Sequence, residues 1–242
     1  DNQLYGSGLV ACNTFLNDPG NHLLFIGTYH SKGLYTVNTI TGEVINYPVV
    51  KQKIFHENIN QVLLDRDKNL WVCFNNGVRL FNIHTKEYQF LSPTIKNASF
   101  LNSGVNAVLE DDDGSIWFAS RERGLLRYDK KLKEIKPFVP GNGQLTADYI
   151  LSLFKDSKGN IWLGYHAQSG IVCIGKNRSS IQSYNYLNYK IPQADVAGIS
   201  ESKTGSIFFT LHVYGLGEIM KNEKNYFIGL GELPSSSTCY GC

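Results

Sequence analysis

The stretch Val105–Phe138, VNAVLEDDDGSIWFASRERGLLRYDKKLKEIKPF, contains four short apolar runs separated by turn residues. The runs are VNAVLE, SIWFAS, GLLRYD and EIKPF, and the first turn is Asp111-Asp112-Asp113-Gly114. An Asp side chain in such a turn can accept a hydrogen bond from the backbone two residues on, and Gly adopts the left-handed conformation that closes a hairpin. Short runs rich in Val, Ile, Trp, Phe and Tyr between turns predict β-strands. We therefore expect a four-stranded meander that needs similar neighbours to bury its faces.

The same pattern recurs along the chain at a nearly constant interval. Aligned on the aromatic residue of the second run, the copies read LFIGT, LWVCF, IWFAS, IWLGY and IFFTL. The successive intervals are 46, 46, 45 and 46 residues, counted between Phe25, Trp71, Trp117, Trp162 and Phe208. A period of about 40–50 residues with four strands per unit is typical of a β-propeller. The sequence predicts an all-β chain, a β-propeller of four-stranded antiparallel blades with five repeats visible.

We expect residues 1–242 to form a single propeller domain. The predicted blades cover residues 9–58, 59–104, 105–149, 150–195 and 196–231, and the tail 232–242 shows no strand pattern. One further period after Val196 reaches Cys242, where a sixth repeat would begin. This spacing favours a piece cut from a longer array, and it leaves open whether five blades close into a ring.

Composition agrees with a turn-rich β protein and excludes several classes. The chain has 14 Tyr, 13 Phe and 23 Gly, and its formal charge of +2 comes from interspersed acidic and basic residues. We therefore expect no nucleic-acid partner. No apolar run reaches the roughly 18–20 residues that span a bilayer, so this segment itself is expected to make no membrane contact. Three cysteines are expected to be small buried residues within strands, whereas the terminal pair is interpreted as incidental: Cys12, Cys73 and Cys173, then Cys239 and Cys242.

The repeat carries a recognisable motif, D-x-x-G-x-[IL]-W-hydrophobic-[GA] followed by G-L-x-x-[YF]-[DN]. It stands here as Asp111–Ala119 with Gly124–Asp129, and its first half recurs as Asp156–Gly164. The other copies keep parts of it, and the departures from the motif are Lys68 in the second copy, Gly175 in the fourth and Met220 in the fifth. The motif resembles the two-component regulator propeller repeat, and the similarity covers nearly the whole chain.

The resemblance implies a function that the residues alone do not give. Proteins with such repeats are mostly the sensing parts of bacterial hybrid two-component regulators, in which periplasmic propellers precede a membrane helix and a histidine kinase. Many respond to breakdown products of polysaccharides. The resemblance thus implies a periplasmic sensor segment with an oligosaccharide or other small ligand, and a homodimer formed through the receptor. The competing interpretation is a protein-interaction or dimerisation propeller without a small ligand.

No catalytic or metal-binding constellation is expected. The first strands of the repeats carry no carboxylate until the far turn, whereas glycosidases need a pair set for acid–base work. Nucleophile elbows and His-pair metal motifs are absent from the sequence. The acidic turn at Asp111–Gly114 lacks ligands at alternating positions and a closing Glu, so it is interpreted as a hairpin turn. We expect neither enzymatic activity nor a cofactor nor a metal in this segment.

Candidate binding residues lie in the loops that join the second and third strands. In a propeller these loops and the connectors between blades share one face, around the mouth of the central channel. Tyr can stack on a sugar ring, and Arg can bind a carboxylate or sulfate through two parallel hydrogen bonds. The candidates in these loops are Tyr29, His30, Asn75, Arg121, Arg123, Tyr165, His166, His212 and Tyr214.

Three asparagines, Asn13, Asn60 and Asn106, share one position near the start of the first strand. A ring of amides there could line the channel mouth, so Asn60 and Asn106 join the candidates. The alternative is that these amides tie neighbouring blades together by hydrogen bonds to the backbone. For the loop residues, the alternative is that exposed loops are polar whether or not they bind a ligand. Both alternatives stay open at the level of sequence.

Overall fold

The computed structural model describes residues 11–29, 33–49, 57–138, 145, 148–167, 170–219 and 225–229. These residues form five antiparallel sheets of four strands each, and every sheet is built from consecutive strands of the chain. The all-β class and the four-stranded blades predicted from the repeat are thereby confirmed. The chain forms two compact units, Asp1–Val105 and Asn106–Cys242, which are described one after the other.

The first unit contains two blades. Their strands are β1 (Cys12–Asp18), β2 (Leu23–Thr28), β3 (Leu34–Asn38) and β4 (Val44–Tyr47), then β5 (Ile59–Leu64), β6 (Leu70–Phe74), β7 (Gly77–Asn82) and β8 (Glu87–Phe90). A short 3₁₀ helix, η1 (Ala98–Asn102), follows the second blade. It lies in a stretch that the sequence predicts to be a plain connector, so this helix was not expected.

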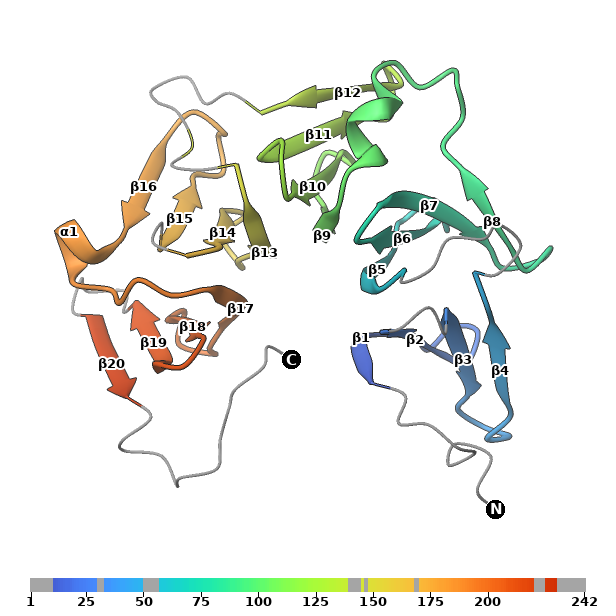
Figure 1. Ribbon diagram of the computed structural model, residues 1–242, viewed down its shortest axis with the longest axis horizontal. Helices are drawn as coiled ribbons and strands as arrows, with labels where there is room; N and C mark the ends of the chain where they lie inside the picture. The colour runs from blue at the N-terminus through green and yellow to red at the C-terminus, as the bar shows by residue number, and fades with distance from the viewer. Residues whose placement is uncertain are drawn as a thin grey trace. The chain divides into compact units, whose positions relative to one another are not determined.

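The second unit contains the other three blades. Their strands are β9 (Val105–Glu110), β10 (Ile116–Ser120), β11 (Leu125–Asp129) and β12 (Glu134–Pro137); β13 (Ile150–Lys155), β14 (Ile161–Tyr165), β15 (Ile171–Ile174) and β16 (Ile181–Tyr184); β17 (Val196–Glu201), β18 (Ile207–Leu211), β19 (Gly215–Ile219) and β20 (Asn225–Gly229). A one-turn helix, α1 (Tyr186–Tyr189), follows β16 and was also not expected. Within this unit the first strand of each blade lies on the inner side and the fourth strand on the outside (Figure 1).

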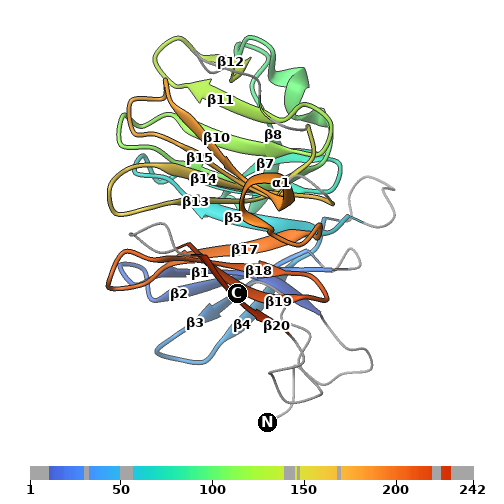
Figure 2. The same cartoon turned by 90° about the vertical axis from the view of Figure 1, so that its left-hand side faces the viewer.

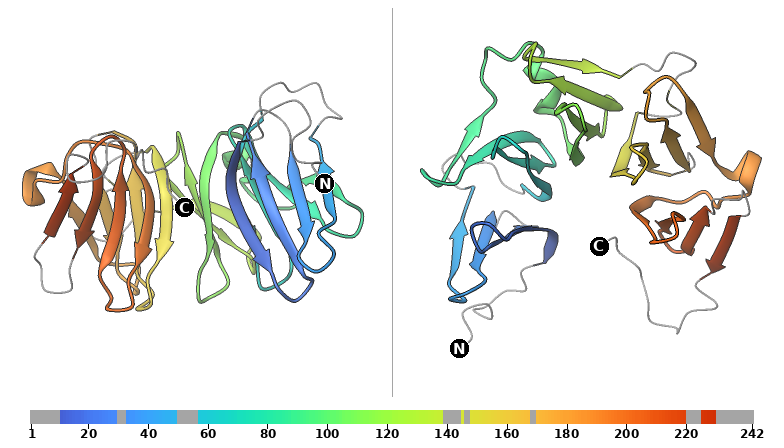
Figure 3. Two further views of the ribbon diagram at one scale, coloured as in Figure 1. Left: turned by 90° about the horizontal axis from the view of Figure 1, so that it is seen from below. Right: turned by 180° about the vertical axis from the view of Figure 1, so that it is seen from behind.

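Each blade is a twisted sheet, as Figure 2 shows for β17 to β20. Second strands are the most buried elements, because β6, β10 and β14 have all five residues buried. Such strands pack against neighbouring blades on both faces, and their sequences are apolar at almost every position. Within the second unit the blades follow one another face to face (Figure 3), and apolar clusters fill the spaces between them.

A carboxylate holds each of the three tryptophans. Asp65, Asp111 and Asp156 are 2%, 4% and 6% exposed, and each accepts a hydrogen bond from the indole N–H six residues on, at 2.9, 3.1 and 2.9 Å. A buried carboxylate requires such donors, since leaving it without a partner would be costly. The Asp and Trp of the repeat motif are therefore one structural device, and the hairpin-turn interpretation of Asp111–Gly114 is supported by the turn bond from Gly114 N to Asp111 O.

The cysteines within strands differ in burial. Cys73 is fully buried, as expected, and Cys173 is intermediate. The expectation for Cys12 is wrong, because this residue is exposed at the start of β1. Strand ends are where a side chain can leave the sheet, which explains the difference from the mid-strand Cys73.

Candidate functional site

One position recurs directly after the second strand of every blade. It is occupied by Tyr29, Asn75, Arg121, His166 and His212. At four of these positions the backbone N–H donates to the carbonyl of the residue just before the first strand of the same blade: Tyr29 to Ala11, Asn75 to Asn58, His166 to Tyr149 and His212 to Asp195, at 3.0–3.2 Å. These loops are therefore fixed to the start of the first strand, and the repeat brings chemically different side chains to equivalent places.

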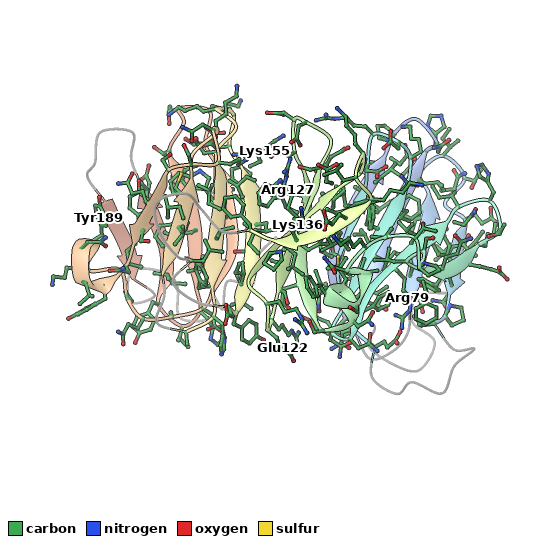
Figure 4. All side chains as sticks on the ribbon, turned by 90° about the horizontal axis from the view of Figure 1, so that it is seen from above. Arg79, Glu122, Arg127, Lys136, Lys155 and Tyr189 are labelled. Carbon is green, nitrogen blue, oxygen red and sulfur yellow. The ribbon has the colours of Figure 1, made fainter. Side chains whose placement is uncertain are left out.

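In the second unit, Arg121 and Asn106 lie in direct contact. Arg121 is half-buried in the loop between β10 and β11, and its Nε donates to Oδ1 of Asn106 at 2.9 Å. The loop is closed by Ser120, whose hydroxyl accepts hydrogen bonds from the backbone N–H groups of Glu122 and Arg123. Arg123 and Glu122 are exposed. Figure 4 shows Glu122 at one edge of the unit, with Lys155 and Arg127 in the opposite half.

His166 forms a second cluster, between the next two blades. Its Nδ1 lies 2.9 Å from Oδ1 of Asp195, and its ring packs on Tyr149 with a centroid separation of 4.5 Å. The same Asp195 oxygen accepts the backbone N–H of Ala167. A carboxylate beside Nδ1 favours the tautomer that carries its proton on Nδ1, which leaves Nε2 as a hydrogen-bond acceptor. Tyr149 and Asp195 thus fix His166 with its ring half-exposed.

Sequence reasoning missed Tyr149 and Asp195. Each directly precedes the first strand of a blade, Ile150 or Val196. A signal was present, because these positions recur with the repeat just as the loop positions do. The candidates come from the loops between second and third strands and from the asparagines of the first strands, so these two side chains were not considered. We call Asn106, Arg121, Tyr149, His166, Asp195 and His212 the loop-end cluster.

The loop between β18 and β19 contributes exposed side chains. His212 is exposed, and its backbone is held by the carbonyl of Asp195. Val213 and Tyr214 follow with 61% and 49% of their surface exposed. Val213 has a φ of 63°, which is rare for a β-branched residue and strained. The loop thus presents to solvent both His212, a member of the loop-end cluster, and Tyr214.

The prediction for Tyr165 is wrong. Its side chain is fully buried as the last residue of β14, so it cannot stack on a ligand. The equivalent residues Thr28, Phe74, Ser120 and Leu211 are also at most 2% exposed. The position equivalent to Tyr29 is His166, one residue later than the sequence pattern suggested.

The candidates of the first unit have structural partners. Asn75 Oδ1 accepts the backbone N–H of Asn58 at 3.1 Å, which uses its amide to shape the loop. Tyr29 is half-buried, and His30 lies outside the described residues. Nothing in the described part of this unit gathers them into a cluster comparable to that of the second unit.

The asparagine position supports the structural alternative rather than a ring of amides. Asn13 Nδ2 donates to the carbonyl of Ile59, Asn60 to that of Val105 and Asn106 to that of Ile150, at 2.8–2.9 Å. Ser152 Oγ makes the corresponding bond to Val196 at 2.8 Å. Asn13 and Asn60 sit at register shifts of β1 and β5, and such a bulge redirects a side chain. Asn60 is therefore a latch to the next first strand, whereas Asn106 is both a latch and the partner of Arg121.

Two further observations concern the described residues. None of their His, Cys, Asp and Glu side chains gather in a group of three or more that could hold a metal ion. In the same part of the chain, no helix is both long enough and apolar enough to cross a membrane.

Two segments that contain these loops match a known family of repeats. Residues 99–122 and 144–167 match the family model of the two component regulator propeller. Each matched segment ends in the loop after a second strand, at Glu122 and Ala167. Histidine kinase P4 of Formosa agariphila is 27% identical over 188 residues, which are 74% of this chain and 14% of that protein. The chain therefore spans a small part of this curated relative.

Solved structures share the fold. The extracellular domain of BT4673 from B. thetaiotaomicron superposes with a TM-score of 0.70 at 16% identity, over 94% of this chain and 32% of that one. Virginiamycin B lyase from Staphylococcus aureus gives a TM-score of 0.69 at 13% identity, over 96% and 73%. At these identities the likeness concerns the fold. The resemblance seen in the sequence is thereby confirmed: the chain is built of β-propeller blades, and two of its segments match the two component regulator propeller repeat.

Proposed function

We propose that this chain is part of the extracytoplasmic, ligand-sensing propeller region of a hybrid two-component receptor, and that its loop-end cluster binds an oligosaccharide. The observation that carries the proposal is the placement of Arg121, His166 and His212 at equivalent loop positions, directly after the second strands of three successive blades. Two of these loops end the segments that match the regulator propeller family. A histidine kinase is among the similar proteins, which supports a signalling role.

The chemistry of the cluster suits a sugar that carries an acidic group. The Arg121 guanidinium is held by Asn106 through Nε, so its two terminal nitrogens have the geometry to bind a carboxylate or sulfate side by side. His166, fixed by Asp195 and Tyr149, offers a ring edge and a polar Nε2. Tyr214 supplies an exposed aromatic face. Arg121, His166 and Tyr214 each lie directly beside the end of a strand, which limits their motion and lowers the entropic cost of binding.

The proposed role is binding without catalysis. The virginiamycin B lyases show that enzymes occur on similar propellers, so the fold does not decide the question. In the first strands of the second unit, the carboxylates Glu110 and Glu201 lie at the end away from the loop-end cluster, whose own acid is Asp195. Asp195 is engaged by His166 and by the backbone of Ala167.

A thermal-shift experiment tests the proposal. The chain is screened against neutral, carboxylated and sulfated oligosaccharides. At a ligand concentration about a hundredfold above Kd, Tm is expected to rise by about 5–10 °C. The double substitution Arg121→Ala/His166→Ala should abolish the rise, whereas Glu122→Ala, an exposed neighbour, should retain it. A rise that survives the double substitution would remove the loop-end cluster from the binding site.

A second candidate function is a propeller that binds another protein or a second copy of itself. Exposed Tyr186 and Leu187 on α1, at 50% and 85% exposure, favour this alternative. Sedimentation of the chain with and without the oligosaccharide panel separates the two functions. A stable dimer that Leu187→Ser dissolves, together with no thermal shift for any sugar, would replace the sensor proposal with the interaction proposal.

A further inference from the structure

The groove between the last two blades of the second unit contains a cavity of about 460 Å³. It is lined by Asp156, Trp162, Cys173, Gln182, Tyr184 and Tyr189 from the fourth blade and its following helix, and by Gly205, Ile207 and Ile219 from the fifth. Trp162, Cys173 and Gln182 are cross-strand neighbours and therefore face the same way. The cavity lies away from the loop-end cluster, at the end of the blades where the hairpin turn of Asp156 lies.

The preceding groove of the same unit shows what fills this place in the repeat. There Trp117 corresponds to Trp162, and it is fully buried. The Arg127 and Arg178 guanidinium carbons lie 5.7 and 5.8 Å from its ring centroid. Arg178 also donates to both oxygens of Asp111, at 2.6 and 2.7 Å. The third blade's groove thus holds an aromatic ring, a buried carboxylate and two guanidinium groups.

The later groove keeps the ring and the carboxylate, but its described residues include no counterpart of either guanidinium group. Cys173 stands where Arg127 stands in the third blade, because each pairs with its blade's tryptophan across the strands. The Asp156 carboxylate, 6% exposed, receives its hydrogen bonds from neutral groups: the indole of Trp162, the amides of Asn160 and Lys158, and the Asn160 side chain. Within the described part of the chain it forms no ion pair. Nearby, Glu201 binds Ser157 in the turn that follows Asp156.

From this comparison we propose that the cavity binds a guanidinium group supplied from outside the described chain, as on an arginine side chain or a small guanidinium compound. Trp162, with Tyr184 stacked 5.7 Å from it, provides an aromatic surface for a planar cation. Asp156 and Glu201 provide negative charge. Lys158, which also lines the cavity, offsets part of this charge. A guanidinium is planar and weakly hydrated, so it suits a partly buried aromatic site better than an ammonium does. The site is independent of the proposed sugar-binding function.

A matched pair of small probes tests the charge requirement. Butylguanidinium and butylurea have nearly the same shape, and only the first is a cation. Titration followed by calorimetry or by NMR shifts of the Trp162 indole N–H should give saturable binding of butylguanidinium, about tenfold or more tighter than that of butylurea. Equal affinities for the two probes would overturn the proposal.

Substitutions at Cys173 locate the site. Cys173→Arg places in this groove the residue that the third blade already accommodates as Arg127, so it should abolish binding while the chain stays folded. Cys173→Ser should retain binding. Gln182→Lys, at an exposed position of the same face, adds a positive charge without touching the core and should weaken binding about tenfold. Binding unaffected by both Cys173→Arg and Gln182→Lys would place the probe elsewhere and refute the assignment.

Two further arms identify the source of the guanidinium. Acetyl-Gly-Arg-Gly-amide, compared with its citrulline counterpart, asks whether an arginine within a peptide enters the cavity or whether a free small compound is required. Residues 220–224, which follow Ile219, lie outside the described residues and include Lys221 and Lys224. If butylguanidinium binds only to the Lys221→Ala/Lys224→Ala variant, the natural occupant is a lysine of this chain, and the proposal of an external ligand fails.

Discussion

At the scale of single residues, the ion pair of Arg79 and Glu57 stands out because both charges are buried. The side chains are 9% and 1% exposed, and Arg79 Nη2 lies 2.9 Å from Glu57 Oε1. The guanidinium also packs over Phe74 and Phe90, at 4.7 and 5.2 Å from their ring centroids. Asn76 donates to the same carboxylate. Such a pair contributes little net stability against an apolar replacement, but losing one partner leaves a buried charge.

Removing Glu57 should therefore destabilise the chain strongly. Glu57→Ala is expected to lower the free energy of unfolding by about 3–5 kcal/mol, because Arg79 keeps a buried charge without its partner. Denaturant unfolding measures the change. Lys136→Ala serves as a control, since Lys136 pairs with Glu134 while 62% exposed, and such pairs contribute about 1 kcal/mol or less. Equal losses for the two variants would contradict this account of the pair.

Cys173 offers a second test at this scale. Burial, together with the nearby negative charge of Asp156, raises the pKa of its thiol from 9.0 to about 12. A raised pKa keeps the thiol protonated, so the reactive thiolate at pH 8 is about a thousandfold scarcer than for a thiol of the ordinary pKa. Iodoacetamide labelling resolved by peptide mass spectrometry should modify the exposed Cys12 quickly and Cys173 very slowly. The Cys173 rate should climb about tenfold per pH unit above pH 8, and labelling of both cysteines at one rate would disprove the shift.

At the scale of elements, the start of the third strand depends on a glycine. Gly170 precedes β15 with a φ of +72°, and a Cβ there would lie 2.2 Å from the carbonyl oxygen of Tyr184. Gly33 precedes β3 with a φ of +82° and the same 2.2 Å approach, to Tyr47. In these two blades the backbone of the fourth strand leaves no room for a side chain at this point, so Gly33 and Gly170 are required by contact as well as by conformation.

Alanine at two glycines separates these effects. Gly170→Ala is expected to destabilise the chain by about 2–4 kcal/mol, from the clash added to the strain of a positive φ. Gly42 has a φ of +73°, but a Cβ added there would meet nothing within 4 Å, so Gly42→Ala should cost about 1 kcal/mol. Lys86 and Lys133 occupy the equivalent turn position of other blades with φ values of 59° and 49°, which shows that strain alone is tolerated. Thermal unfolding of both variants measures the difference, and a Gly42→Ala loss as large as that of Gly170→Ala would exclude the clash.

Most of the strands could be predicted because the same strand pattern recurs in five copies of the repeat. Alternation, turn residues and the spacing of Asp to Trp are local, and each copy supports the others. The helices η1 and α1 could not be predicted in this way, because connectors do not repeat. The loop-end cluster was found in part: Arg121 and His166 were predicted, whereas Tyr149 and Asp195 depend on contacts between neighbouring blades. The error at Tyr165 was a shift of one residue, which moves a side chain from solvent to the core.

At the scale of the whole molecule, the latches repeat from one first strand to the next. Asn13, Asn60, Asn106 and Ser152 each donate to the carbonyl of a residue that begins a first strand: Ile59, Val105, Ile150 and Val196. These four acceptor residues are fully buried. A buried carbonyl that loses its donor costs about 1–3 kcal/mol. Within the units, the latches of Asn13, Asn106 and Ser152 therefore fix successive blades where a side chain of one blade meets the backbone of the next.

Asn106 is the latch at which the proposed ligand site and the blade contact meet, because its Oδ1 accepts from Arg121 while its Nδ2 holds Ile150. Asn106→Ala should lower the free energy of unfolding by about 1–3 kcal/mol and also weaken oligosaccharide binding, since Arg121 loses its anchor. Asn106→Asp keeps an acceptor for Arg121 but removes the donor to Ile150, so it should lose stability and retain binding. Hydrogen exchange of the β13 amides reports the latch, and the thermal shift reports the ligand.

A double-mutant cycle of Asn106→Ala and Arg121→Ala completes this test. If Arg121 and the latch act together, the stability changes of Asn106→Ala and Arg121→Ala should fall short of additivity by about 0.5 kcal/mol or more. Ligand added to the native chain should then slow exchange at the start of β13, because a ligand that orders Arg121 also orders Asn106. Additive changes, with no effect of ligand on β13 exchange, would show that the latch belongs to the scaffold and that a ligand signal leaves the cluster by another route.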